Sequence, residues 1–180
     1  NRRVLPLVLV IVLPTALGIT GGATAGAATA PTTGSTLPTG TSTVTIDVDG
    51  APRTAVVHVP PSVAAAPGRA VPLVLHLHGG LGSPEGSIAT TGLVEAADAA
   101  GFVVAFPRGT PVGAPLPNGS TGYVWNAGRC CGVAARDGVD DVGFLDGLID
   151  TLEESLPIDP DRVVMAGHSN GAMMTWRFAC

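Results

Sequence analysis

The sequence contains no lysine, and only 13% of its residues are charged. Its nine basic residues are all arginines, set against fourteen acidic residues, and the formal net charge is −5 at pH 7. A nucleic-acid-binding protein usually carries a basic patch, and none is visible, so we expect no nucleic-acid partner. Hydrophobic residues make up 46% of the chain, which excludes an intrinsically disordered polyelectrolyte. The length of 180 residues fits one domain with an appendage.

Histidine is also scarce, and all four histidines lie in the first 168 residues. His76 and His78 have the i, i+2 spacing of a chelating pair, but no third ligand is apparent, so we expect no metal site. Nothing in the sequence indicates an organic cofactor. His58 shares one face of a predicted strand with Thr54 and Val56, and we interpret it as an ordinary solvated residue.

The first thirty residues have the pattern of an export signal. Arg2 and Arg3 precede an apolar run over residues 4–17, and small residues follow as far as Ala30. This pattern predicts a secretory signal peptide over residues 1–30, with a twin-arginine signal as the alternative. The run is shorter than the roughly 20 residues of a membrane-spanning helix, and no cysteine near it offers a lipid anchor. We therefore expect a secreted, extracellular protein without a stable membrane anchor, starting with a flexible leader over residues 31–42.

The remaining sequence has the periodicity of an α/β domain. Alternating or continuous apolar residues predict strands, and apolar residues spaced three or four apart predict helices. The predicted strands are 43–49, 53–59, 71–77, 102–106 and 162–166, and the predicted helices are 87–99, 142–156 and 171–178. Residues 107–138 show no period and form a long loop. After an initial hairpin, strands and helices alternate, which predicts a mostly parallel sheet with helices on its faces.

The pentapeptide Gly167-His168-Ser169-Asn170-Gly171 fits the pattern G-x-S-x-G. A predicted strand leads into it and a predicted helix leaves it, as in a nucleophile elbow. Glycines on both sides fit such a tight turn, and the helix N-terminus favours negative charge beside Ser169. Ser169 is therefore our candidate nucleophile; the alternative is a glycine-rich turn with an incidental serine.

An acyl-transfer serine also needs N–H donors for the developing oxyanion. The N–H of Asn170 is one candidate, because it directly follows Ser169. The second should come from the loop after the predicted strand 71–77, where we favour Gly80 over Leu81 because glycine leaves the backbone open to substrate. We expect His78 to brace this loop rather than to transfer protons.

Five segments in this order resemble one family. They are Leu77–Gly80, Ala97–Val104, Trp125–Gly128, Asp140–Phe144 and Gly167–Gly171. Together they are similar to the secreted polyhydroxybutyrate depolymerase and feruloyl or acetylxylan esterase-type group of α/β-hydrolases, over about residues 43–180. The resemblance implies an α/β-hydrolase fold and a Ser-His-Asp esterase with Ser169 as nucleophile, acting on an ester substrate, polymeric esters included. It also implies that Trp125 helps to shape the substrate site; the alternative is packing over the core.

The sequence departs from this family where the acid and base should follow the serine. No His, Asp or Glu follows Ser169, whereas the family order is Ser, then Asp, then His. His168 is too close in the chain to reach the Ser169 hydroxyl, and Asp140 and Asp141 are expected to cap the following helix. We therefore expect the C-terminal half of the domain to be missing and this chain to be inactive by itself. The alternative function is a catalytically silent binding protein of the same fold at a polymer or cell-wall surface.

Cysteine occurs three times, an odd number for an exported protein. We expect Cys180 to form a disulfide with Cys130 or Cys131. The alternative is that all three are buried thiols.

Overall fold

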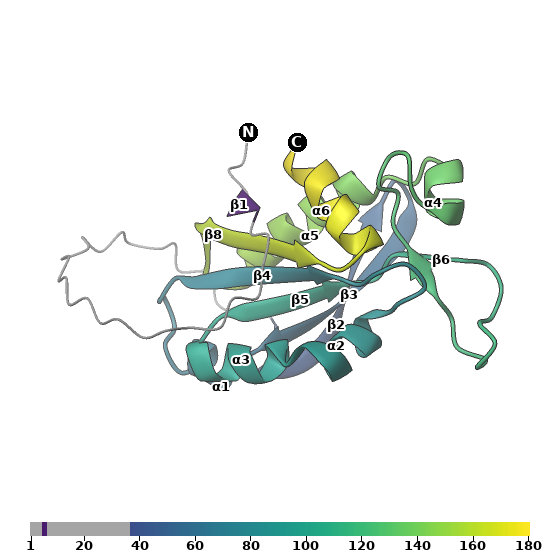
Figure 1. Ribbon diagram of the computed structural model, residues 1–180. Helices are drawn as coiled ribbons and strands as arrows, with labels where there is room; N and C mark the ends of the chain where they lie inside the picture. Colours follow the sequence, from purple (N-terminus) through teal and green to yellow (C-terminus); the bar gives the residue numbers. More distant parts are fainter. Residues whose placement is uncertain (1–4, 7–36) are drawn as a thin grey trace, which may run out of the picture.

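The computed structural model describes residues 5–6 and 37–180 (Figure 1). The predicted signal peptide over residues 1–30 and the leader up to residue 36 lie outside the described residues, apart from Leu5–Pro6. These two residues form strand β1, which pairs in parallel with Val164 and Met165 of strand β8 (Ile158–Gly167).

The main sheet has six strands in the order β1-β8-β4-β5-β3-β2. The other strands are β2 (Gly40–Val48), β3 (Ala51–Val59), β4 (Val71–Leu77) and β5 (Val103–Pro107). Strand β4 lies between β8 and β5 and is parallel to both, whereas β3 is antiparallel to β5 and to β2. The predicted parallel sheet with an N-terminal hairpin is thus confirmed, although β2 begins at Gly40, inside the predicted leader.

Six helices accompany the described part of the sheet. They are α1 (Pro61–Ala64), α2 (Pro84–Thr91), α3 (Leu93–Ala100), α4 (Gly132–Arg136), α5 (Asp141–Ser155) and α6 (Asn170–Ala179). Helices α2 and α3 lie on one face of the sheet, and α5 and α6 lie on the other (Figure 1). The apolar faces of the sheet form a large buried cluster with α5 and a smaller one with α3. Within the described residues, no helix is both long enough and apolar enough to cross a bilayer.

The predicted helix over residues 87–99 is two helices rather than one. Gly92 adopts the left-handed conformation, with φ of 66°, which ends α2 and starts α3 at a new angle. The N-cap is Ser83, whose hydroxyl accepts a hydrogen bond from the Gly86 N–H at 3.2 Å. Ser87, the first residue of the predicted helix, lies inside α2 and is buried. Pro84 directly after the cap suits the first helical turn.

His58 is buried, so its interpretation as a solvated residue is wrong. Its Nδ1 lies 2.9 Å from the hydroxyl of Thr41, and its Nε2 lies 2.8 Å from a carboxylate oxygen of Asp98. The ring connects β3 to its neighbour β2 and to helix α3. Strand alternation alone does not reveal this role, because α3 covers the face on which His58 lies.

The long segment 107–138 contains short elements of its own. Strands β6 (Thr110–Pro111) and β7 (Tyr123–Val124) pair with each other, and α4 follows them. This segment lies beside the carboxyl end of β4, where β7 also pairs with Gly82. The loop therefore borders the turn that contains Ser169.

Candidate active site

Ser169 occupies the sharp turn between β8 and α6 and is exposed. Its backbone has φ of 50° and ψ of −117°, a strained conformation for a residue with a side chain. A Cβ at Gly167 would lie 2.5 Å from the Gly171 carbonyl carbon, and one at Gly171 would lie 2.3 Å from the Leu77 oxygen. Both glycines are therefore required by close backbone contacts, as the G-x-S-x-G pattern predicted.

The turn is fixed against the end of β4. The His168 N–H donates to the Leu77 carbonyl at 3.1 Å, and the Gly171 N–H donates back to the His168 carbonyl at 2.8 Å. Ser169 therefore lies at the carboxyl edge of the parallel strands, where open α/β sheets bind their ligands.

Two backbone N–H groups beside Ser169 are available as donors. Asn170 is the first residue of α6, so its N–H has no carbonyl partner within the helix. The Gly80 loop lies next to it, because a Cβ at Gly80 would be 3.6 Å from the Asn170 Cβ. Among the described residues, neither N–H donates a hydrogen bond. The Leu81 N–H, by contrast, donates to the Tyr123 carbonyl at 2.8 Å, which favours Gly80 over Leu81 as the second donor.

His78 braces the Gly80 loop, as predicted. Its Nδ1 lies 2.8 Å from the Gly79 carbonyl, and its Nε2 accepts the Gly109 N–H at 3.2 Å. This pattern requires a neutral ring with the proton on Nδ1. Burial lowers the pKa of His78, and the nearby Arg108 guanidinium acts in the same direction. Both ring nitrogens are occupied, so His78 is unsuited to proton transfer.

His76 lies on β4, and burial lowers its pKa, with further lowering by His78 and His168. Its Nδ1 is buried and has no partner among the described residues. No group of three or more His, Cys, Asp or Glu side chains that could hold a metal ion occurs in residues 5–6 and 37–180.

Trp125, which the resemblance implies helps to shape the substrate site, has no exposed surface. Its indole N–H donates to the His78 carbonyl at 2.9 Å, and its ring stacks near Phe144 at a centroid distance of 6.5 Å. The His78 ring lies on it at 4.9 Å. Trp125 therefore packs over the core, the alternative considered above, and supports the loop that carries Gly80.

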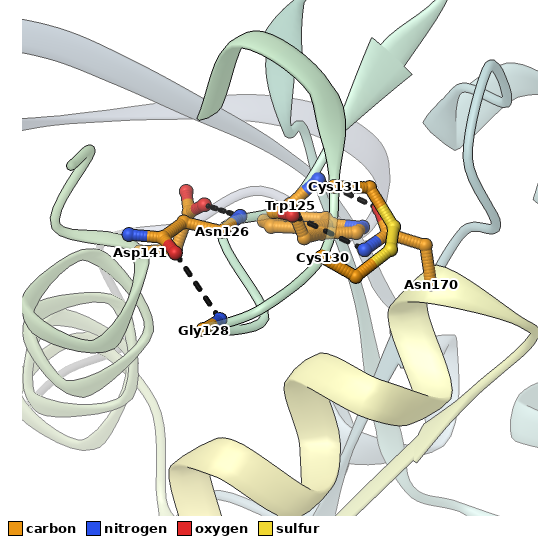
Figure 2. Close-up of a disulfide and its surroundings, with 7 residues drawn as sticks. All are labelled: Trp125, Asn126, Gly128, Cys130, Cys131, Asp141 and Asn170. Atoms are coloured by element: carbon orange, nitrogen blue, oxygen red, sulfur yellow. Dashed lines mark hydrogen bonds between the residues drawn. A yellow bond between two sulfur atoms is a disulfide. The ribbon is translucent and has the colours of Figure 1, made fainter. Parts of the chain in front are cut away.

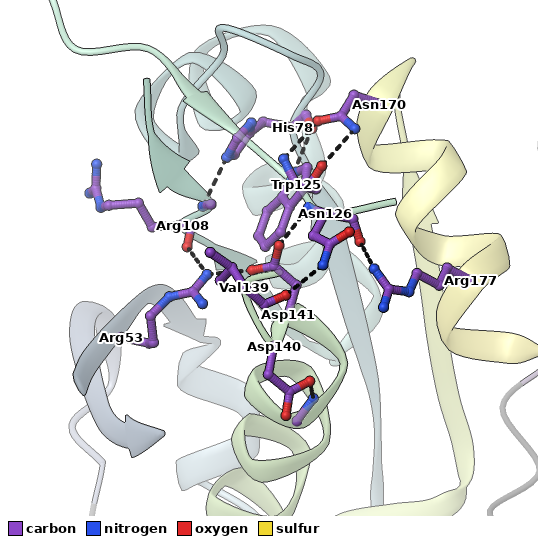
Figure 3. A network of polar contacts seen from close by, with 12 residues as sticks. Arg53, His78, Arg108, Trp125, Asn126, Val139, Asp140, Asp141, Asn170 and Arg177 are labelled. Carbon is purple, nitrogen blue, oxygen red and sulfur yellow. Dashed lines mark hydrogen bonds and ion pairs between the residues drawn. The ribbon is translucent and has the colours of Figure 1, made fainter. Parts of the chain in front are cut away.

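A polar network behind Ser169 was not predicted from the sequence (Figure 3). The Asn170 side chain accepts the Trp125 N–H at 2.8 Å and donates to the Trp125 carbonyl at 3.1 Å. The Asn126 N–H donates to Asp141 at 2.7 Å, and Arg53 binds the other oxygen of Asp141 at 2.7 Å. We expected both Asp140 and Asp141 to cap helix α5, but only Asp140 does so. Its carboxylate accepts the Gly143 N–H at 2.9 Å.

The expected disulfide of Cys180 with Cys130 or Cys131 is wrong. Cys130 and Cys131 are bonded to each other, beside Trp125 and Asn170 (Figure 2), whereas Cys180 is an exposed free thiol at the end of α6. Adjacent cysteines need no loop closure to meet, and the turn holding them is fixed by the Cys131 N–H, which donates to the Trp125 carbonyl at 3.2 Å. An odd count of cysteines cannot reveal which pair forms.

A pocket of about 530 Å³ opens farther along the same edge of the sheet. The turn between β2 and β3 lines it, together with Arg108 and Tyr123. Arg108 forms an ion pair with Glu85 and lies over the Tyr123 ring, 5.1 Å from its centroid. Ser169 does not line this pocket, so we do not place the catalytic site in the pocket.

The chain is similar in sequence and in fold to known esterases. No protein-family model matches the chain. It is 36% identical over 133 residues to the putative esterase NocK of Nocardia uniformis subsp. tsuyamanensis, covering 73% of this chain and 35% of that protein. It is 31% identical over 112 residues to feruloyl esterase B of Piromyces equi, covering 62% of this chain and 19% of that protein. Acetyl xylan esterase from Aspergillus awamori superposes with a TM-score of 0.54 at 18% identity, covering 77% of this chain and 46% of that one.

The chain has the α/β-hydrolase fold. The resemblance to esterases of this fold, first indicated by five sequence segments, is confirmed by the relatives. This α/β-hydrolase chain spans about a third of the first relative's length and a fifth of the second's.

Proposed function

We propose that the protein is a serine esterase that hydrolyses carboxylic esters through an acyl-enzyme on Ser169. One observation carries the proposal: an exposed serine in a strained turn, flanked by two backbone N–H groups without partners among the described residues. The esterase relatives support the same reaction class.

In this mechanism the Ser169 oxygen bonds to the ester carbonyl carbon, and a general base takes the hydroxyl proton. The negative charge on the former carbonyl oxygen is stabilised by the N–H groups of Gly80 and Asn170. The intermediate collapses with loss of the alcohol, which receives the proton, and water then hydrolyses the acyl-enzyme. No described histidine is hydrogen-bonded to the Ser169 hydroxyl, so we infer that the base and its acid lie outside the described residues, and that residues 37–180 alone are inactive.

For the substrate we propose feruloyl or acetyl esters of polysaccharide, or polyhydroxyalkanoate. The names of feruloyl esterase B and of acetyl xylan esterase favour the first two. Methyl ferulate, acetylated xylan and polyhydroxybutyrate, assayed in parallel with the whole protein, separate the three. Secretion is also a proposal, drawn from residues 1–30; the test is N-terminal sequencing of protein from the culture medium, and retention of the uncleaved chain in cells would refute it.

The decisive experiment replaces the nucleophile in the whole protein. Ser169→Ala should lower kcat for p-nitrophenyl acetate by at least about 10⁴-fold, because the acyl-enzyme can no longer form. The control is Ser62→Ala, which removes an exposed hydroxyl on α1 and should leave kcat unchanged. Unchanged turnover in Ser169→Ala would refute the assignment. A wild-type protein that neither turns over esters nor reacts with a fluorophosphonate would instead indicate the silent binding protein.

A further inference from the structure

The peptide group that joins Trp125 to Asn126 is hydrogen-bonded at both of its ends (Figure 3). Its carbonyl accepts the Asn170 side-chain amide at 3.1 Å, together with the N–H groups of Ala127 at 3.0 Å and Cys131 at 3.2 Å. Its N–H donates to Asp141 at 2.7 Å. A carboxylate on the N–H side polarises the peptide and makes its carbonyl a stronger acceptor. Asp141 and Asn170 therefore act on one another through this peptide without touching.

Asp141 is held as a buried ion pair. Its side chain has 0% exposed surface, that of Arg53 has 13%, and the ion pair spans 2.7 Å. The Arg53 guanidinium also lies over the Phe144 ring at 4.2 Å. Arg53 comes from β3, so the pair connects the hairpin to the start of α5. A carboxylate so enclosed cannot move toward solvent without leaving Arg53 unpaired.

The Asn170 side chain links the Trp125 backbone to the turn that contains Ser169. Its amide binds the N–H and the carbonyl of the same residue, Trp125, at 2.8 and 3.1 Å, which fixes its plane as well as its distance. Asn170 directly follows Ser169 and is buried. Any shift of the Trp125 backbone therefore moves the Asn170 N–H.

We propose that Asp141 is a positioning residue for the reaction: through the peptide between Trp125 and Asn126 it orients Asn170, and thereby aims the Asn170 N–H at the oxyanion. This proposal rests on the proposed function. The Asp141 side chain is fully buried and bonded to Arg53 and the Asn126 N–H, so it acts through that peptide rather than by contact with Ser169.

The test compares two isosteric variants of adjacent carboxylates in the whole protein. Asp141→Asn should lower kcat by roughly 10- to 100-fold with KM within about twofold, because an oxyanion donor is displaced. Asp140→Asn is the matched control: Asp140 also accepts one backbone N–H at the start of α5, and asparagine caps a helix equally well. Its kcat should stay within about twofold of wild type.

Two measurements separate positioning from loss of fold. The affinity for a phenylboronic acid, whose tetrahedral adduct on serine occupies the oxyanion site, should fall in parallel with kcat in Asp141→Asn. A merely structural defect lowers the amount of folded enzyme but leaves both quantities unchanged per folded active site. In an Asn170→Ala background, which retains the N–H but lacks the amide, Asp141→Asn should lower kcat by less than about threefold further.

Equal kcat in Asp141→Asn and Asp140→Asn would overturn the proposal, as would independent, multiplicative losses in the double variant. If Asp141→Asn does not fold, Asp141→Glu keeps the charge beside Arg53 while displacing the carboxylate; it should lower kcat several-fold, and an unchanged kcat would overturn the proposal. Ser169→Ala distinguishes failure of the esterase assignment from failure of the positioning role of Asp141. An active Ser169→Ala refutes the esterase assignment, whereas an inactive one combined with an unaffected Asp141→Asn refutes only the positioning role.

Discussion

Gly171→Ala places a methyl group where two backbone carbonyls already lie. The added Cβ would be 2.3 Å from the Leu77 oxygen and 2.4 Å from the His78 oxygen. An ordinary carbon–oxygen contact needs at least about 3.4 Å, so α6 and the end of β4 must separate by roughly 1 Å. Neither obstacle is a flexible side chain, since both carbonyls belong to the segment leading into the Gly80 loop.

The separation affects both stability and activity. Overpacking of this size costs about 1–3 kcal/mol of unfolding free energy. The kcat should also fall, by about 100-fold, because a misplacement near 1 Å between nucleophile and oxyanion donors has that consequence. Ser169 and Asn170 lie on α6's side of the clash and Gly80 on the other, so the two donors separate directly.

The assay is the kcat for p-nitrophenyl acetate at saturation, together with the urea midpoint of the same whole-protein preparation. The control is Gly147→Ala within α5, where the new Cβ meets only the Ile46 side chain at 3.5 Å. That change should raise the unfolding free energy by roughly 0.5–1 kcal/mol, as expected for glycine to alanine inside a helix, and leave kcat unchanged. A Gly171→Ala enzyme with wild-type kcat and midpoint would refute the close-packed elbow.

Two further predictions concern buried histidines. Burial lowers the pKa of His78 below its ordinary 6.5, so the unfolded chain takes up the proton first as the pH falls. The stability that neutral His78 contributes is therefore complete above pH 6.5 and is lost as the pH falls toward the lowered pKa. The urea midpoint should decline from about pH 6.5 downward. A midpoint that stays constant down to about pH 5 would contradict this prediction. His58→Ala should cost about 2–3 kcal/mol in urea unfolding, because it opens a cavity and removes the bonds to Thr41 and Asp98. Asp98→Ala should cost less than about 1 kcal/mol, since the Asp98 side chain is 47% exposed, and equal losses would argue against the buried role of His58.

The strands and the elbow could be predicted because their signals are local. Strand β4 matches the predicted range 71–77 at both ends, since a nearly continuous apolar run, buried on one face and partly buried on the other, has clear limits. The two glycines of the elbow were identified from spacing alone, and the structure shows the carbonyls that require them. Gly92 was overlooked because a single glycine is tolerated inside a helical sequence, and only its positive φ reveals the break.

The polar supports of the site could not be predicted for a different reason. Arg53 and Asp141 are 88 residues apart, and nothing local marks either one as the other's partner. Asp141 stood beside Asp140 in a sequence context that fits helix capping for both. Which of the two faces the core depends on the angle at which α5 meets the sheet, and that angle is a tertiary property.

The long-range polar contacts also bear on how the site works. Apolar packing of α6 on the sheet excludes water, but it is weakly directional and tolerates small rotations of a helix about its axis. A rotation of that kind would turn the Asn170 N–H relative to the Gly80 loop. The two bonds between Asn170 and Trp125 oppose it, because hydrogen bonds weaken steeply when their angle departs from linearity. Directional polar contacts from four segments of the chain therefore set the donor geometry, and we expect substitutions among them to lower kcat per folded active site.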